Sequence, residues 1–253
     1  MVMLAAMNKP CFLLAVLMGL VFPLVPRVYV SAAPYDPPHQ QAIVDDALRP
    51  ASAIRDALRE SSIIPDVLDD FTPSLSLTLT YPSTHSTVEL GNTLRPSLLT
   101  HQPVYQFHPF TPTPLLPSDD TSSFFYTLIL TDPDAKSRKH PIWSEYCHWI
   151  LTNASSPELI HHHNTNTNTK TKHRILKKYL PPSPPPGTGL HRYVFVLLRG
   201  ETGADRKDVS APKKRRHWGY GEERRGVRDW AAEYGLVVVG ANFFYARHEG
   251  DWV

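Results

Sequence analysis

Cysteine is almost absent from this sequence, because Cys11 and Cys147 are the only two among 253 residues. Cys11 lies in an apolar N-terminal run that we expect to be removed, which leaves Cys147 as the one remaining thiol. An internal disulfide is therefore excluded, and the fold must depend on its hydrophobic core. With 42% hydrophobic residues, the chain is long enough to bury such a core within one domain.

A strong excess of charge of either sign is also missing. The formal net charge of +2 comes from Lys9 and Arg27, because residues 34–253 hold 24 basic and 24 acidic side chains. A mature chain without the N-terminus is expected to be neutral overall. This balance gives no argument for a nucleic-acid partner, and it predicts at most peripheral contact with a membrane.

The N-terminal apolar run is too short for an ordinary membrane-spanning helix. It covers residues 11–25, is interrupted by Pro23, and falls short of the roughly 20 apolar residues that a span needs. The small residues of "VSAAP" follow it and suit a signal peptidase. We therefore predict that residues 1–33 are a cleaved secretory signal and that the protein is secreted or enters the secretory pathway or vacuole. A membrane anchor is the alternative.

The sequence changes its pattern near residue 62. Residues 34–61 are charged and helix-prone, with a break at Pro50, and we expect an N-terminal extension that lies outside the core. Residues 62–253 are predicted to form the main domain. Its first clear element has period two, with apolar side chains at Leu75, Leu77, Leu79 and Tyr81, which predicts a half-buried strand.

Three later segments are apolar on both faces, as expected for strands inside a sheet that is covered on each side. They are residues 124–132, 146–151 and 191–199. Prolines and other turn residues separate these short strands, so the sequence predicts a mainly β fold, an antiparallel β-sandwich with a few short peripheral helices. One helix is indicated before the final strand by Val227, Trp230, Ala231 and Tyr234, with Gly235 at its C-terminal end.

Two loop insertions are expected in this domain, at residues 155–175 and 201–222. The first contains His161, His162 and His163, but adjacent histidines in a low-complexity loop make a poor fixed metal site, so we expect no metal and no cofactor. A basic segment at residues 205–225 overlaps the second insertion and is interpreted as a solvated loop. Contact of that loop with an anionic surface is the less favoured alternative.

Polar side chains gather where the predicted strands begin or end. Strand alternation places Tyr146, His148 and Ile150 on one face and Cys147 and Trp149 on the other. Cys147 therefore cannot pair with His148 as a nucleophile with its base.

The same alternation applies to the next apolar strand. It places His191, Tyr193 and Phe195 on one face and sends Arg192 to the opposite face. Asp132 ends its own strand, since the proline that follows favours an extended turn. Each of these residues has an ordinary structural explanation by itself, but together their spacing is more specific.

These residues carry a resemblance to a known family. The stretches "DPDAKSR", "HW" at 148–149, "PPGTGLHRYVFVLL" and "ANFF" resemble the phosphatidylethanolamine-binding protein family over residues 62–252. Residues 63–97 resemble its fungal branch, which includes the carboxypeptidase Y inhibitor. The resemblance implies an antiparallel β-sandwich of that family's type, with a small pocket that accepts phosphate or a phosphorylated head group.

The resemblance assigns candidate ligand-binding residues by motif. They are Asp132, Asp134, His148, Pro185, His191 and Tyr193. We expect both histidines to face one pocket with Asp132 at its edge and to hold an anion as protonated donors. Two departures from the family pattern stand out: Lys136 replaces a proline and adds a cation at the mouth, and Cys147 replaces a histidine but points away from the pocket.

The preferred function is a secreted, non-enzymatic binding protein for phosphate or phosphorylated head groups. The alternative is a serine carboxypeptidase inhibitor that presents residues 34–62 to the protease. An enzyme is less favoured, since no nucleophile stands beside a base and no catalytic residue is predicted. If the chain is secreted, Asn153 in "NAS" is a candidate glycosylation site.

Overall fold

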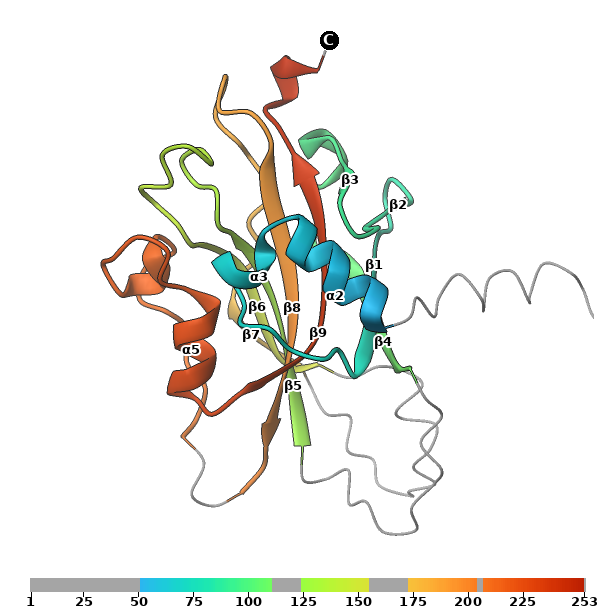
Figure 1. Cartoon of the computed structure of the whole chain (residues 1–253), viewed down its shortest axis with the longest axis vertical. Coiled ribbons are helices and arrows are strands. Elements are labelled where there is room, and N and C mark those ends of the chain that lie inside the picture. The colour runs from blue at the N-terminus through green and yellow to red at the C-terminus, as the bar shows by residue number, and fades with distance from the viewer. Residues whose placement is uncertain (1–50, 111–123, 155–172, 204–206, 253) are drawn as a thin grey trace, which may run out of the picture. The chain divides into compact units, whose positions relative to one another are not determined.

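The computed structural model describes residues 51–110, 124–154, 173–203 and 207–252 (Figure 1). Its strands are β1 (Leu75–Tyr81), β2 (Ser86–Thr87), β3 (Asn92–Thr93), β4 (Val104–Pro109), β5 (Phe124–Asp132), β6 (Tyr146–Ala154), β7 (Arg174–Lys177), β8 (His191–Glu201) and β9 (Val237–Ala246). The α-helices are α2 (Ala51–Glu60), α3 (Ile63–Asp66) and α5 (Val227–Glu233), with short 3₁₀ turns η1 (Pro96–Leu98), η3 (His217–Gly219) and η4 (Glu249–Asp251). The strands and the late helix predicted from periodicity are all present.

The strands form two sheets. The larger has the order β3-β9-β8-β5-β6-β7 and is antiparallel except where the short β3 runs parallel to β9. The smaller has the antiparallel order β2-β1-β4. Strands β5 and β8 lie inside the larger sheet and are buried along almost their whole length, which explains why their sequences are apolar on both faces.

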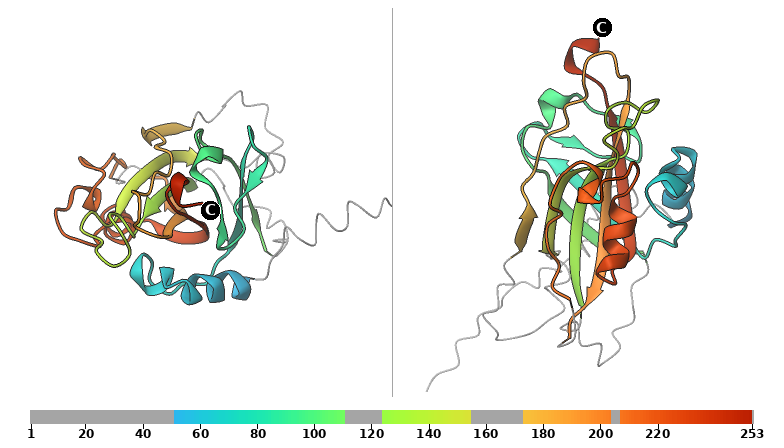
Figure 2. Two further views of the ribbon diagram at one scale, coloured as in Figure 1. Left: turned by 90° about the horizontal axis from the view of Figure 1, so that it is seen from above. Right: turned by 90° about the vertical axis from the view of Figure 1, so that its left-hand side faces the viewer.

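The small sheet packs on one face of the large sheet. Leu77 and Leu79 of β1 and Phe107 of β4 share a buried cluster with Phe195 and Leu197 of β8. The large sheet therefore lies between the small sheet on one face and the helices on the other (Figure 2). The mainly β, antiparallel sandwich fold with a few short helices is confirmed.

The helices cover the opposite face of the large sheet. Ile54 and Leu58 lie one turn apart on α2 and are buried in the same cluster as Val194 and Val196 of β8 and Trp230 of α5. The expectation that residues 34–61 lie outside the core is therefore wrong for α2. The apolar stripe of this helix docks on the sheet because the sheet's second face would otherwise be exposed.

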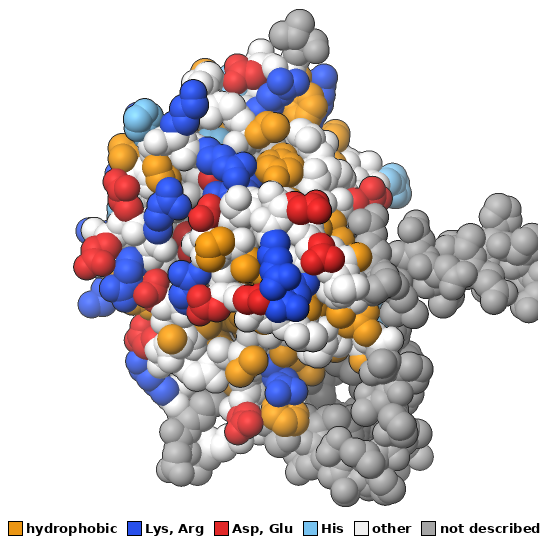
Figure 3. Space-filling model, viewed as in Figure 1, with side chains coloured by type: hydrophobic (Ala, Val, Ile, Leu, Met, Phe, Trp, Pro, Cys, Tyr) orange, Lys and Arg blue, Asp and Glu red, His pale blue; other side chains and the backbone are white. Residues whose placement is uncertain are grey.

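Ion pairs surround the docked helix. Arg59 pairs with Asp70 at 2.6 Å, Arg55 contacts the same carboxylate, and Arg228 of α5 pairs with Asp69 at 3.0 Å. Figure 3 shows acidic and basic side chains interspersed over this face. Because exposed pairs of this kind add little stability, the buried stripe of α2 must supply most of the docking energy.

Parts of the two predicted loop insertions can be compared with the structure. Residues 1–33, the histidine run 161–163 and most of 155–175 lie outside the described residues. The expectation of a solvated loop at 205–225 is wrong in part, since Val209 and Trp218 are buried and anchor this segment to the sheet. Within the described ranges, no helix is long and apolar enough to cross a membrane.

Candidate functional site

A cavity of about 210 Å³ opens at the end of the large sheet where β5 ends and β6 and β8 begin. Its described lining consists of Asp132, Ala135, Lys136, Trp143, Tyr146, His148, Leu180, Pro181, Ser183, Pro184, Pro185, His191, Tyr193 and Arg216. Five of the six residues assigned by motif are among them, so the structure brings together Asp132, His148, Pro185, His191 and Tyr193. Their binding of a ligand stays a prediction.

Asp132 is buried and fully engaged at the cavity edge. Its Oδ1 accepts the backbone N–H of Asp134 at 2.7 Å, and its Oδ2 lies 2.9 Å from Nδ1 of His191. Burial raises the pKa of the Tyr193 phenol well above its usual value, and the charge of the Asp132 carboxylate adds to this rise. The turn that follows β5 therefore fixes Asp132 as an acceptor for protein groups.

The second nitrogen of His191 is also engaged. Its Nε2 lies 2.9 Å from Oγ1 of Thr188, and that hydroxyl donates its single hydrogen to the carbonyl of Pro185 at 2.7 Å. Nδ1 lies against Asp132, so protein groups engage both ring nitrogens of His191. We expected His191 to donate to an anion, but these contacts leave it no free ring nitrogen.

His148 has one nitrogen that the protein does not engage. Its Nδ1 donates to the carbonyl of Leu180 at 2.8 Å. Burial lowers the pKa of His148, with the nearby Asp132 carboxylate opposing this shift. In the neutral ring the proton sits on Nδ1, because a carbonyl only accepts, and Nε2 is then an acceptor available to a ligand.

An irregular register sets the direction of His148. Leu130 pairs with Trp149 and Thr131 pairs with Cys147, so His148 has no partner on β5 and forms a β-bulge. The bulge interrupts strand alternation. Trp149 therefore joins the cluster of Tyr193 on the cavity side, where alternation predicted the opposite face.

The same bulge changes the position of Ile150. This residue lies with Cys147 in the cluster beneath the helices, although alternation placed it with His148. Cys147 is confirmed to point away from the cavity, and burial raises the pKa of its thiol to about 12. It is therefore an unreactive core residue.

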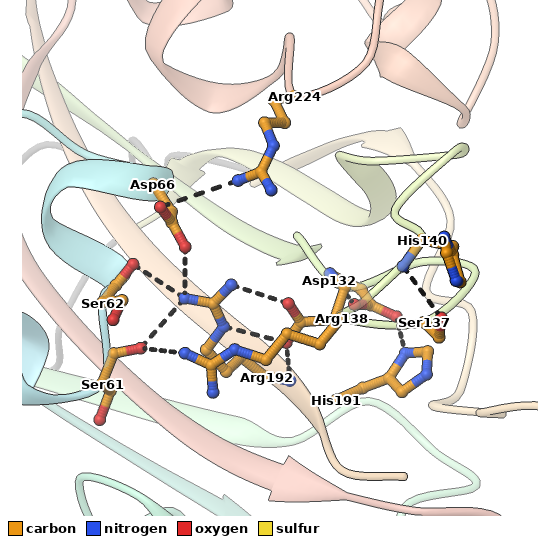
Figure 4. Close-up of polar contacts among 11 residues, drawn as sticks. Ser61, Ser62, Asp66, Asp132, Ser137, Arg138, His140, His191, Arg192 and Arg224 are labelled. Atoms are coloured by element: carbon orange, nitrogen blue, oxygen red, sulfur yellow. Dashed lines mark hydrogen bonds and ion pairs between the residues drawn. The ribbon is translucent and has the colours of Figure 1, made fainter. Parts of the chain in front are cut away.

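Asp134 differs from the other assigned residues because it does not line the cavity. Its carboxylate receives Nε of Arg192 at 2.9 Å and Nη2 at 2.7 Å. On the far side, Nη1 of Arg192 donates to the carbonyls of Ser61 and Ser62 and to Asp66. Figure 4 shows Arg192 pointing toward this helix junction, while the neighbouring His191 points toward Asp132. Asp134 is thus a structural anchor for α2 and α3.

Sequence reasoning missed part of the cavity mouth. The ring of Trp143 contacts two cations, with Nζ of Lys136 at 5.4 Å and Cζ of Arg216 at 3.9 Å from its centroid. Lys136 was predicted at the mouth, but Arg216 belongs to the basic segment and reaches it through a backbone bridge to Tyr146. The basic run was the only available signal, and it does not indicate which residue faces the cavity.

The described lining of the cavity has no arrangement typical of nucleophilic catalysis. No serine or cysteine nucleophile in its described lining stands beside a free base, and the one buried thiol lies on the other face. A search of the described residues finds no group of His, Cys, Asp and Glu side chains able to hold a metal ion. Elsewhere, Asn153 on β6 is half-buried.

Comparison with known proteins gives a consistent result. The family model described as phosphatidylethanolamine-binding protein matches residues 84–244. The chain is 35% identical over 199 residues to the carboxypeptidase Y inhibitor of Saccharomyces cerevisiae, which covers 72% of this chain and 89% of that protein.

Solved structures agree with this match. A crystal structure of carboxypeptidase Y inhibitor complexed with the cognate proteinase superposes with a TM-score of 0.64 at 34% identity, over 81% of this chain and 99% of that one. A phosphatidylethanolamine-binding protein from Plasmodium vivax superposes with a TM-score of 0.54 at 22% identity, over 76% and 96% of the two chains. The second similarity supports the fold alone.

Proposed function

The chain belongs to the phosphatidylethanolamine-binding protein family, and we propose that it inhibits a serine carboxypeptidase. The observation that carries this proposal is its similarity to the yeast carboxypeptidase Y inhibitor, which extends over 89% of that protein at 35% identity. The likeness to an inhibitor bound to its proteinase supports the same partner class. An inhibitory role also fits a site without a nucleophile and base pair.

The structure narrows the segment that such an inhibitor can present. Residues 34–62 were the predicted protease contact, but α2 is docked through Ile54 and Leu58, and the Ser61 and Ser62 carbonyls are held by Arg192. A docked helix is a poor fit to the extended cleft in which a protease holds its chain. We therefore assign the presented segment to residues 34–50.

Inhibition assays with carboxypeptidase Y test the proposal. The mature chain beginning at residue 34 should inhibit, and a chain beginning at residue 51 should inhibit at least about tenfold more weakly because the presented segment is gone. The matched control replaces residues 34–50 with a Gly/Ser segment of equal length. No inhibition by the mature chain would contradict the proposal, and equal inhibition by both chains would place the contact on the folded domain.

A second candidate function is favoured by the cavity itself. Two cations at its mouth and the free Nε2 of His148 inside it suit phosphate or a phosphorylated head group. In calorimetric titrations with inorganic phosphate, His148→Ala should weaken binding about tenfold through one lost hydrogen bond. His85→Ala, an exposed histidine outside the cavity, is the control. Binding that is absent, or equal in both variants, would contradict an anion pocket.

A further inference from the structure

The charged side chains that line the cavity differ in how accessible they are to a ligand. Lys136 and Arg216 are exposed at the mouth, and the structure gives each a contact with the face of Trp143. Asp132 is the only carboxylate among the described lining residues. The two cations are therefore open to a ligand.

Asp132 is poorly accessible to a ligand ammonium group. It is 3% exposed, accepts a hydrogen bond from the Asp134 N–H through Oδ1, and contacts Nδ1 of His191 through Oδ2. Both ring nitrogens of His191 are themselves engaged by protein groups. A zwitterionic head group would bring a cation toward two free cations and would find no free carboxylate among the described lining residues.

The Nε2 atom of His148 gives a second basis on which the cavity can select a ligand. With Nδ1 donating to Leu180, Nε2 of the neutral ring can only accept a hydrogen bond. A singly protonated phosphate monoester carries a P–OH group that can donate to it. A phosphodiester carries no such hydrogen and one charge at most. At neutral pH the larger fraction of a monoester is the dianion, which has no P–OH but offers a second negative charge to the two rim cations.

The size of the cavity limits the rest of the ligand. Its volume of about 210 Å³ is below the roughly 300 to 1,000 Å³ of sites that enclose drug-sized molecules. A phosphate with a small substituent fits inside, and a larger substituent must leave through the mouth.

We propose that the cavity selects a terminal phosphate monoester over a zwitterionic phosphodiester head group, with Lys136 and Arg216 as the residues that determine this preference. The inference rests on the proposed anion pocket and names its ligand class. The dianion directs its two negative charges toward the two rim cations, and the singly protonated fraction directs its P–OH toward Nε2 of His148.

Calorimetric titration of the mature chain with three small probes tests this selection. Methyl phosphate should bind at least about tenfold tighter than dimethyl phosphate and glycerophosphoethanolamine. Dioctanoyl phosphatidate, a lipid monoester, is the fourth probe. If dioctanoyl phosphatidate binds with the same affinity as methyl phosphate, the ligand is a free phosphate monoester. If it binds at least about tenfold tighter, the ligand is a lipid phosphate monoester. Both results support the monoester class.

Paired variants test the two rim cations. Lys136→Gln with Arg216→Gln should reduce the preference for methyl over dimethyl phosphate to about twofold or less, since the charge that favours the dianion is removed. The matched control, Lys139→Gln with Lys213→Gln, removes two exposed charges from the same segments outside the cavity lining and should leave the preference unchanged.

The outcomes separate two failures. If no phosphate compound binds the native chain, the anion pocket itself is wrong. If methyl and dimethyl phosphate bind equally, the pocket stands and the monoester selection is overturned. A tenfold preference that survives in the rim variant, or falls equally in the control, overturns the role of Lys136 and Arg216.

Discussion

Among single residues, Glu145 is the most unusual titratable group outside the cavity. It is 1% exposed, and burial raises the pKa of its carboxyl to about 8, although the Thr131 hydroxyl and the Val227 N–H donate to it and oppose this shift. Gly226 accommodates it, since a Cβ there would lie 2.3 Å from its carboxyl carbon. The folded chain therefore favours a protonated Glu145 at neutral pH.

This protonation predicts a pH-dependent stability. The folded pKa of about 8 lies above the ordinary value of 4.5, so the folded state binds more protons between these values. Stability is fully present below about pH 4.5 and falls as pH rises to about 8, by up to roughly 5 kcal/mol. In urea denaturation across this range, Glu145→Gln should flatten the decline.

Glu60→Gln, on the exposed end of α2, is the control and should keep the native slope. A slope that is the same in native protein and in Glu145→Gln would show that Glu145 does not titrate as the structure implies.

Among the elements, α2 has the clearest consequence for stability. Its buried stripe predicts that Leu58→Ala, at a fully buried position, costs about 2 to 5 kcal/mol in chemical denaturation. Ser52→Ala on the exposed side of the same helix should change stability by less than about 0.5 kcal/mol. If both variants are equally stable, α2 is not docked in solution.

A deletion at the N-terminus that includes α2 should also lower the stability of the domain. Removal of residues 34–62 takes away α2 and the Ser61 and Ser62 carbonyls that satisfy Arg192. It leaves a buried guanidinium short of acceptors, which is costly. This deletion therefore cannot separate inhibition from folding, whereas a chain that begins at residue 51 can.

For the whole molecule, we propose a secretory route. The apolar run followed by "VSAAP" supports it, and N-terminal sequencing of the mature protein should find a start close to residue 34. Mass spectrometry of Asn153→Gln should show the loss of one glycan. A mature chain that still begins before Val30 would contradict cleavage, and an unchanged glycan mass would exclude Asn153 as the modified residue.

The local sequence by itself determined the sandwich and identified five of the residues that line the cavity. Alternation at Leu75, Leu77 and Leu79 and the doubly apolar runs of β5 and β8 reflect which faces are buried, and burial is a property that each strand carries in its own pattern. The motifs around Asp132 and His191 were sufficient to place five of the six assigned residues at one cavity.

Only the tertiary structure decided which of those groups are free. The bulge at His148 depends on the pairing of β6 with β5. Arg216 lines the same cavity although it lies 68 residues after His148 in the sequence. Asp134 is bound by Arg192, which also contacts the Ser61 carbonyl after α2. Thr188 and Asp132 engage the two ring nitrogens of His191, and the Leu180 carbonyl engages Nδ1 of His148. Periodicity records burial along one element, but hydrogen-bond partners and charge neighbours come from elements distant in sequence, so they exist only once the chain has folded.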